Sequence, residues 1–315
     1  MALVDLSTPP PPPAGLLEAL PRRATLTLPE LRLVAESAGR APLPFDVDAP
    51  GGPGGPGGPD AASTLEDRLG RGTGSLEAAA YRSVLEALPD PWSSLARRGL
   101  TSGGDVDPAL SGAVGLLATP RLALDLDVVV GAARARAWHR ESRGAVATLA
   151  TADGVVFELA WFAADQWGDE LARVAVLPEE VTPRDSGVPA LVELPYELVD
   201  ATAEARRSDR LDLLPVLAAQ HSGAVTDGAG RVYDDAEAAE LLAELATEPQ
   251  GRLRVLAADV SGPDVGTVGV LSWLLLADGW HALRPRDDAA RVEVRRVEPG
   301  DLAAELAPVL AEVGR

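Results

Sequence analysis

Two series of short segments with alternating apolar and polar residues constrain the fold of this chain more than any other feature. In the first series, Leu122, Leu124 and Leu126 alternate with more polar neighbours in RLALDLDVVV, residues 121–130. Successive side chains of a β-strand point to opposite faces, so a period of two predicts a strand with one buried face. Further strands are predicted at 134–141, 144–151 and 154–162, and the short turns at 142–144 and 153–154 predict an antiparallel meander.

The second series begins about 130 residues later and has the same order. The tripeptide Ala277-Asp278-Gly279 contains the Asp-Gly pair that favours a tight hairpin. An amphipathic helix follows each series, from Asp165 to about Ala175 and from Asp301 onward. The second series comprises predicted strands at 252–260, 266–276, 279–285 and 291–297.

Helical segments precede each series of strands. The pairs Thr27/Glu30, Ser63/Glu66 and Asp234/Glu237 have the spacing of a capping box, which marks the start of a helix. Helices are predicted at 27–39, 63–70, 75–88, 92–98, 107–118, 196–208, 213–222 and 234–247. The fold class predicted from these patterns is α+β, a pseudo-twofold pair of α/β halves with a central, mainly antiparallel sheet flanked by two helical bundles.

Proline and glycine set the predicted domain boundary. Residues 9–13 are a proline run that favours an extended segment, and PGGPGGPGGP at 50–59 is typical of a flexible tether. We therefore predict an N-terminal extension with one short helix over 1–60 and an α+β domain over 61–315. The first half of that domain would span about 61–178 and the second about 190–315.

Missing residue types exclude several kinds of chemistry. The chain has no cysteine, lysine, isoleucine or asparagine, and the joint absence of the last three indicates a very GC-rich genome. Without cysteine there is no disulfide, thiolate nucleophile or Cys-based metal site. Without lysine there is neither a Schiff base nor a Walker-type phosphate site. We predict that the protein uses no cofactor and is not an enzyme.

Charge and hydropathy bear on location and partners. The net charge of −20 disfavours nucleic acid as a partner, because an acidic surface repels phosphate. The first 15 residues lack the pattern of a signal peptide. The longest apolar run, residues 268–277, is shorter than the roughly 20 residues that span a membrane. The sequence predicts a cytoplasmic protein without membrane insertion.

Candidates for catalysis are few. The fragment Asp185-Ser186-Gly187 lacks the flanking glycines of a serine-hydrolase signature. His139 and His281 occupy related places in the two halves, and each follows a tryptophan, Trp138 and Trp280. The alternative function is a small-molecule-binding protein or hydrolase with a site between the halves, and it rests on these histidines. The competing interpretation is that both histidines are amphipathic residues at strand ends, whose rings are buried while their nitrogens stay in contact with water. An exposed Trp138 or Trp280 would be an interface anchor, but packing in the core is the interpretation we prefer for each.

The order of these elements resembles the EspG family of actinobacterial type VII (ESX) secretion. The resemblance covers roughly residues 25–315 apart from the tether. It is carried by LTLPELRLVAESAG, RLALDLDVVV, GVVFELAWFAADQWGDELARVAVLP with VELPYELVD, and the segment that begins GRLRVLAADVSGPDVGTVGVLSWLLLADGWHALRP. It implies a chaperone in protein transport that keeps a helical secreted substrate, PE–PPE-like or WXG-type, soluble before export.

The resemblance also implies where a substrate would dock. The matching positions are the turn around 139–144 and the helices within 196–247, although the turn is short for a grasping loop. Apolar contacts would supply the affinity and charged residues at the rim would set the register. The predicted partner-binding residues are Trp138, His139, Arg140, Glu141, Ser142, Arg143, Arg206, Arg207, Leu211 and Leu213.

Overall fold

The computed structural model describes residues 22–45, 76–179, 181–262, 266–286 and 290–313. The chain forms two compact units, which are described separately. Unit 1 comprises residues 1–121 and 139–167, and unit 2 comprises residues 122–138 and 168–315. The helix predicted at 63–70 lies outside the described residues.

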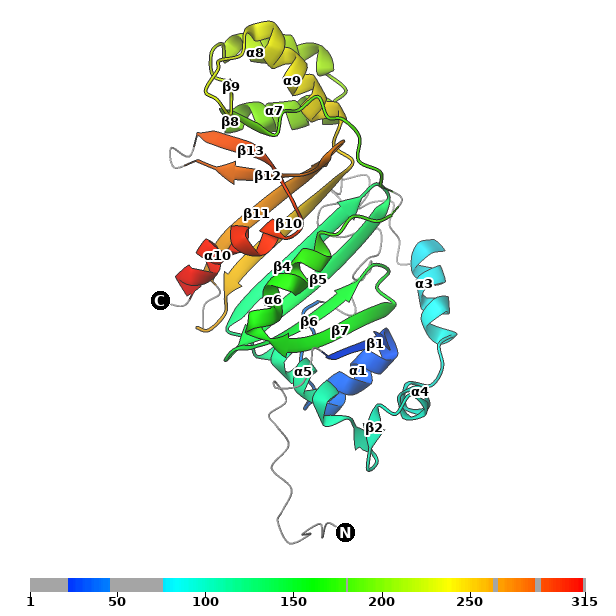
Figure 1. Ribbon diagram of the computed structural model, residues 1–315. Coiled ribbons are helices and arrows are strands. Elements are labelled where there is room, and N and C mark those ends of the chain that lie inside the picture. The colour runs from blue at the N-terminus through cyan, green and yellow to red at the C-terminus, as the bar shows by residue number, and fades with distance from the viewer. Residues whose placement is uncertain (1–21, 46–75, 180, 263–265, 287–289, 314–315) are drawn as a thin grey trace, which may run out of the picture. The chain divides into compact units, whose positions relative to one another are not determined.

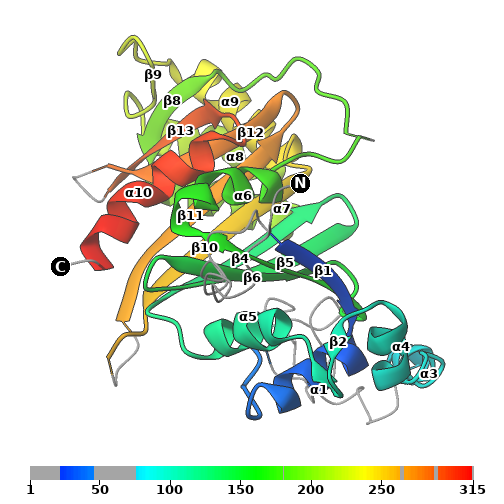
Figure 2. The same ribbon diagram turned by 60° about the horizontal axis from the view of Figure 1, so that its bottom comes forward.

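Unit 1 contains an antiparallel sheet covered by helices on one face. The strands follow the order β1-β7-β6-β5, and residues 139–142 of β5 belong to this unit. Helices α1 and α5 pack on β6 and β7 (Figure 2). Leu26 of β1 and Phe157 and Leu159 of β7 are fully buried. The elements are β1 (Arg22–Thr27), α1 (Leu28–Ser37), α3 (Leu76–Glu86), α4 (Pro91–Arg97), β2 (Thr101–Ser102), β3 (Asp105–Val106), α5 (Pro108–Ala118), β5 (Ala133–Ser142), β6 (Ala145–Thr151) and β7 (Val156–Ala163).

Unit 2 has a longer antiparallel sheet with helices on both faces. Its strands follow the order β5-β4-β10-β11-β12-β13-β8-β9. Helices α7, α8 and α9 pack together beside β8 and β13, and α10 lies across β10 and β11 (Figure 1). The elements are β4 (Leu122–Val130), α6 (Trp167–Val174), β8 (Leu191–Pro195), α7 (Tyr196–Arg207), α8 (Leu214–Gln220), β9 (Thr226–Asp227), α9 (Asp235–Thr247), β10 (Gly251–Asp259), β11 (Gly266–Leu276), β12 (Gly279–Pro285), β13 (Arg291–Val297) and α10 (Asp301–Val313), with the short 3-10 helix η2 (Leu211–Leu213). A second 3-10 helix, η1 (Ala164–Gln166), belongs to unit 1.

The two units repeat one connection. In each unit, one strand comes before the helices and a meander of strands comes after them. The first strand pairs antiparallel with the last strand of that meander. The two pairs are β1 with β7 and β8 with β13. A helix, α6 or α10, follows each meander in the chain. The predicted α+β class, with a mainly antiparallel sheet and two groups of helices, is therefore confirmed.

The strands that precede the helices, β1 and β8, were not predicted. β1 places only Ala24 and Leu26 in the core, which is too short an alternation to stand out in the sequence. β8 contains Val192 and Leu194 as its buried residues and ends at Pro195. Both strands are recognisable from their pairing, which a local sequence pattern does not reveal.

The apolar residues of the helix predicted at 75–88, observed as α3, are not core residues where the structure describes their side chains. Val84 is 48% exposed, and Tyr81, Leu85 and Leu88 are only half-buried. The helix lies at the periphery of unit 1 (Figure 1), where the hydroxyl of Tyr81 donates a hydrogen bond to the Gly154 carbonyl at 2.8 Å. An amphipathic stripe therefore does not guarantee burial here.

Trp138 and Trp280 are both buried, as their interpretation as core residues predicts. The structure leaves them 6% and 2% exposed. β5 continues to Ser142, so Trp138 lies inside a strand instead of at its end. Trp280 packs against Trp273 with ring centroids 6.2 Å apart, and its Nε1 donates to the Ala175 carbonyl at 2.7 Å.

Candidate partner-binding surface

The β5–β6 hairpin is tight. Its two turn residues, Arg143 and Gly144, both have positive φ, 54° and 80°. This is the backbone that a two-residue hairpin turn requires, and glycine tolerates it best. The Gly144 amide donates to Oε1 of Glu141 at 2.8 Å, which fixes the turn. Glu141 and Ser142 are half-buried, and Arg143 is exposed.

The side chains that lead into this hairpin are buried. Besides Trp138, both His139 and Arg140 are buried, with exposed fractions of 2% and 8%. Nε1 of Trp167 donates to Nδ1 of His139 at 2.9 Å, so this ring nitrogen is an unprotonated acceptor. Burial, with the neighbouring charge of Arg140, lowers the pKa of His139 to about 3. These three residues are buried and therefore do not present a surface to a partner.

The segment 206–216, which we call the α7–α8 turn, carries the other predicted site residues on its surface. Arg206 and Arg207 are exposed at the end of α7, and Asp209 takes a positive φ of 55° that ends the helix. The Arg210 amide closes the turn by donating to the Ala205 carbonyl at 2.7 Å. The turn is thereby a fixed part of unit 2.

Apolar side chains on this turn face solvent. Leu211 and Leu213 are 37% and 36% exposed, whereas Leu214, the first residue of α8, is buried in the core cluster of the bundle. Val216, which the sequence did not single out, is 54% exposed. Three exposed aliphatic side chains within six residues mark a surface suited to contact with another protein. Tyr196 and Val232 are further exposed apolar residues of unit 2.

The residues that the sequence offered as catalytic candidates form hydrogen bonds within the fold. The hydroxyl of Ser186 donates to Oε2 of Glu248 at 2.6 Å, and the Gly187 amide donates to Oε1 of the same carboxylate at 2.6 Å. Nε2 of His281 lies 2.8 Å from Oδ1 of Asp278, and its ring is fully buried. Each histidine of the proposed pair is thus packed within its own unit.

In the part of the chain that the structure describes, no cluster of three or more His, Asp and Glu side chains is arranged to hold a metal ion. None of its helices is both long enough and apolar enough to cross a membrane.

The described architecture is the fold of the EspG class of type VII secretion chaperones. The chain is similar to a Mycobacterium tuberculosis protein of this class, the type VII secretion system chaperone EspG5, whose structure was solved in complex with a PE25–PPE41 dimer. The similarity has a TM-score of 0.57 at 12% sequence identity and covers 92% of this chain and 96% of EspG5. No family model and no curated protein matches the sequence. The resemblance to EspG noted in the sequence is therefore confirmed at the level of the fold.

Proposed function

We propose that this protein is a cytoplasmic, non-enzymatic chaperone that binds a helical type VII secretion substrate, PE–PPE-like or WXG-type, and keeps it soluble before export. The observation that carries the proposal is an EspG-like fold over nearly the full length of both chains. EspG5 was solved with a PE25–PPE41 dimer bound, which makes a substrate of that kind the first candidate for this chain.

The α7–α8 turn is the docking surface that we propose. It offers Leu211, Leu213 and Val216 as apolar contacts. Arg206 and Arg207 lie beside them as exposed charged residues. An apolar centre with a charged rim is the usual composition of a protein interface. A substrate helix whose apolar stripe is exposed before export would bury that stripe against these side chains.

The β5–β6 hairpin is proposed only as a secondary contact. Glu141, Ser142 and Arg143 are its accessible residues, whereas Trp138, His139 and Arg140 lie beneath them. A turn of two residues cannot wrap a partner, so its contribution would be a few polar contacts.

The test is an affinity pull-down of the tagged full chain from its native host, with the recovered proteins identified by mass spectrometry. We expect a small helical secretion substrate in near-equal amount with the wild-type protein. Leu213→Asp/Val216→Asp should abolish the recovery, because burying two carboxylates in an apolar contact weakens binding about 100-fold or more.

The matched control is Val270→Asp, which places the same charge at a 57% exposed valine on β11. It should recover the substrate as the wild type does. Equal recovery of the substrate by the wild type and both variants would exclude the α7–α8 turn as the docking surface. Recovery of no substrate by a folded wild-type protein, with the secretion genes expressed, would contradict the chaperone function itself.

A further inference from the structure

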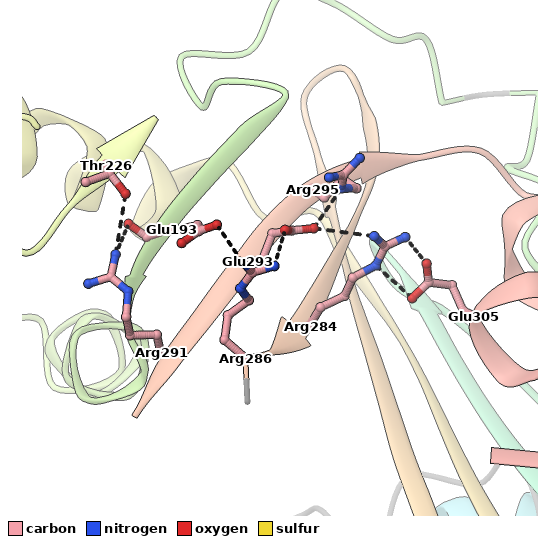
Figure 3. Close-up of polar contacts among 8 residues, drawn as sticks. All are labelled: Glu193, Thr226, Arg284, Arg286, Arg291, Glu293, Arg295 and Glu305. Atoms are coloured by element: carbon pink, nitrogen blue, oxygen red, sulfur yellow. Dashed lines mark hydrogen bonds and ion pairs between the residues drawn. The ribbon is translucent and has the colours of Figure 1, made fainter. Parts of the chain in front are cut away.

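Three arginines of unit 2 converge on one buried carboxylate. Glu293 lies in β13, and its side chain is only 6% exposed. Nε of Arg295 donates to its Oε1 at 2.7 Å, and Nη1 of Arg284 donates to the same oxygen at 3.4 Å. Nη1 of Arg286 donates to Oε2 at 3.4 Å. Figure 3 shows the three guanidinium groups arranged around this carboxylate.

Two further carboxylates hold the outer ends of the cluster. Arg284 forms a two-pronged ion pair with Glu305 of α10, with Nε 3.0 Å from Oε2 and a second contact between Nη2 and Oε1. Nη2 of Arg286 lies 3.6 Å from Glu193 of β8. The cluster therefore joins β8, β13, β12 and α10 (Figure 3). Paired guanidinium groups keep little rotational freedom, so they are already in position for a ligand.

The charges of this cluster are separated by depth. The carboxylates of Glu293 and Glu305 are 6% and 11% exposed, whereas the side chains of Arg286 and Arg295 are 51% and 44% exposed. Anions thus lie beneath and cations lie outside. We call the surface made by Arg284, Arg286 and Arg295 the arginine platform; it presents guanidinium groups to solvent on a chain whose net charge is −20.

The arginine platform lies on the opposite face of β13 from the helical bundle. Val292 and Val294 belong to the core cluster that packs against α7, α8 and α9. Side chains alternate along a strand, so Glu293 and Arg295 point to the other face. A ligand on the arginine platform would therefore approach unit 2 from the side away from the bundle.

We propose that the arginine platform binds a short carboxylate-rich segment of a second partner protein. Guanidinium groups fixed by buried carboxylates present their remaining donors in the fork geometry that matches Asp and Glu side chains. A long polyanion such as nucleic acid is disfavoured, since the rest of the acidic surface repels it. A short acidic segment would contact only the exposed guanidinium groups of the arginine platform.

The test measures binding of a fluorescein-labelled hexaglutamate peptide to the full chain by fluorescence anisotropy at low salt. A hexaglutamine peptide serves as the uncharged probe and should not bind. Arg286→Gln/Arg295→Gln should weaken hexaglutamate binding about tenfold, the sum of two partly exposed ion pairs. Glu293 keeps Arg284 as a partner in this variant, and the melting temperature checks that it folds.

The matched control is Arg173→Gln/Arg231→Gln. These arginines are 51% and 54% exposed and are also paired with carboxylates, so the variant loses the same charge elsewhere. It should bind hexaglutamate within about twofold of wild type, since it keeps all three arginines of the arginine platform. Equal weakening by both variants, or no binding by wild type, would overturn the proposal. Displacement of the peptide by inorganic phosphate at lower concentration than by glutarate would overturn the choice of a carboxylate ligand.

The substrate pull-down separates this inference from the proposed chaperone function. Arg286→Gln/Arg295→Gln should recover the helical substrate normally, since these residues lie on the face of β13 away from the bundle. Loss of the substrate together with hexaglutamate binding would overturn the assignment of two separate surfaces.

Discussion

Two capping boxes with the same sequence spacing differ in burial. Thr27 and Glu30 start α1, and Asp234 and Glu237 start α9, each with both reciprocal hydrogen bonds formed. Glu30 is 1% exposed and pairs with Arg98 at 3.1 Å, whereas the side chain of Glu237 is 41% exposed. Burial raises the pKa of Glu30, but hydrogen bonds from the Thr27 backbone and Ser94, with the Arg98 charge, outweigh it and lower the pKa overall. The spacing predicted both helix starts, but it could not show which glutamate is buried.

Glu30→Gln should therefore cost more stability than Glu237→Gln. Removing the charge from Glu30 leaves Arg98 without its ionic partner beside a buried amide, at about 2 kcal/mol. The same change at the exposed Glu237 should cost at most about 1 kcal/mol. Urea unfolding of the two variants measures the difference. Equal losses would show that the contact with Arg98 adds nothing.

His139 should make stability depend on mildly acidic pH. Its pKa is about 3 in the folded protein and about 6.5 when unfolded. The unfolded chain therefore binds the proton more readily, and the stabilisation present above pH 6.5 is lost as the pH falls toward 3. The unfolding free energy should fall by up to about 1.4 kcal/mol per pH unit in that window.

The measurement compares wild type with His139→Gln by urea unfolding between pH 6.5 and 5, above the range where ordinary carboxyl groups titrate. The variant should start less stable, because it disturbs the contact with Trp167, but its stability should change less with pH. If the unfolding free energies of the two proteins changed with pH in parallel, His139 would be excluded as the source of the pH dependence.

At the scale of elements, periodicity located strands where one face is buried. The predicted bounds 266–276, 279–285 and 291–297 are those of β11, β12 and β13. Alternation is informative there because cross-strand neighbours need the same face buried. β1 and β8 were missed because their pairing partners lie far away in the chain.

The start of β10 requires glycine. A Cβ on Gly251 would lie 2.3 Å from the Val129 carbonyl oxygen on β4 and 3.3 Å from Cβ of Leu275 on β11. Gly251→Ala should therefore separate these strands and destabilise the protein by about 2 kcal/mol or more, the range of overpacked sites. The decrease in melting temperature of Gly251→Ala relative to the wild type measures this destabilisation.

The comparison variant is Gly112→Ala in α5, where a Cβ meets no atom within 4 Å. It should raise stability by roughly 0.5–1 kcal/mol, because alanine favours a helix more than glycine does. A neutral Gly251→Ala would mean that β4 and β10 can move apart without cost.

At the scale of the whole molecule, the fold could be predicted more completely than the site. The repeated order of strands and helices is present in the local pattern, and it identified the class. The predicted residues Leu211 and Leu213 lie on the surface, but Trp138, His139 and Arg140 are buried. The burial of these residues follows from the length of β5, which continues to Ser142, and from the hydrogen bond between Trp167 and His139. The spacing of residues in the sequence determines neither feature. The arginine platform requires the register of β12 and β13, which pairs Arg284 with Glu293.

The two proposed surfaces of unit 2 should respond differently to salt. Apolar contacts at the α7–α8 turn should hold the substrate with similar affinity at about 50 and about 300 mM salt. Hexaglutamate binding to the arginine platform should weaken severalfold over the same range, because ion pairs are screened. Anisotropy titrations at both salt concentrations measure this. A substrate affinity that falls as steeply as that of the peptide would point to charges as the main contact of the turn.

The connection repeated in both units, a strand that pairs with the last strand of the meander beyond its helices, also bears on the origin of the chain. Such a repeat is what duplication and fusion of one ancestral gene leave behind.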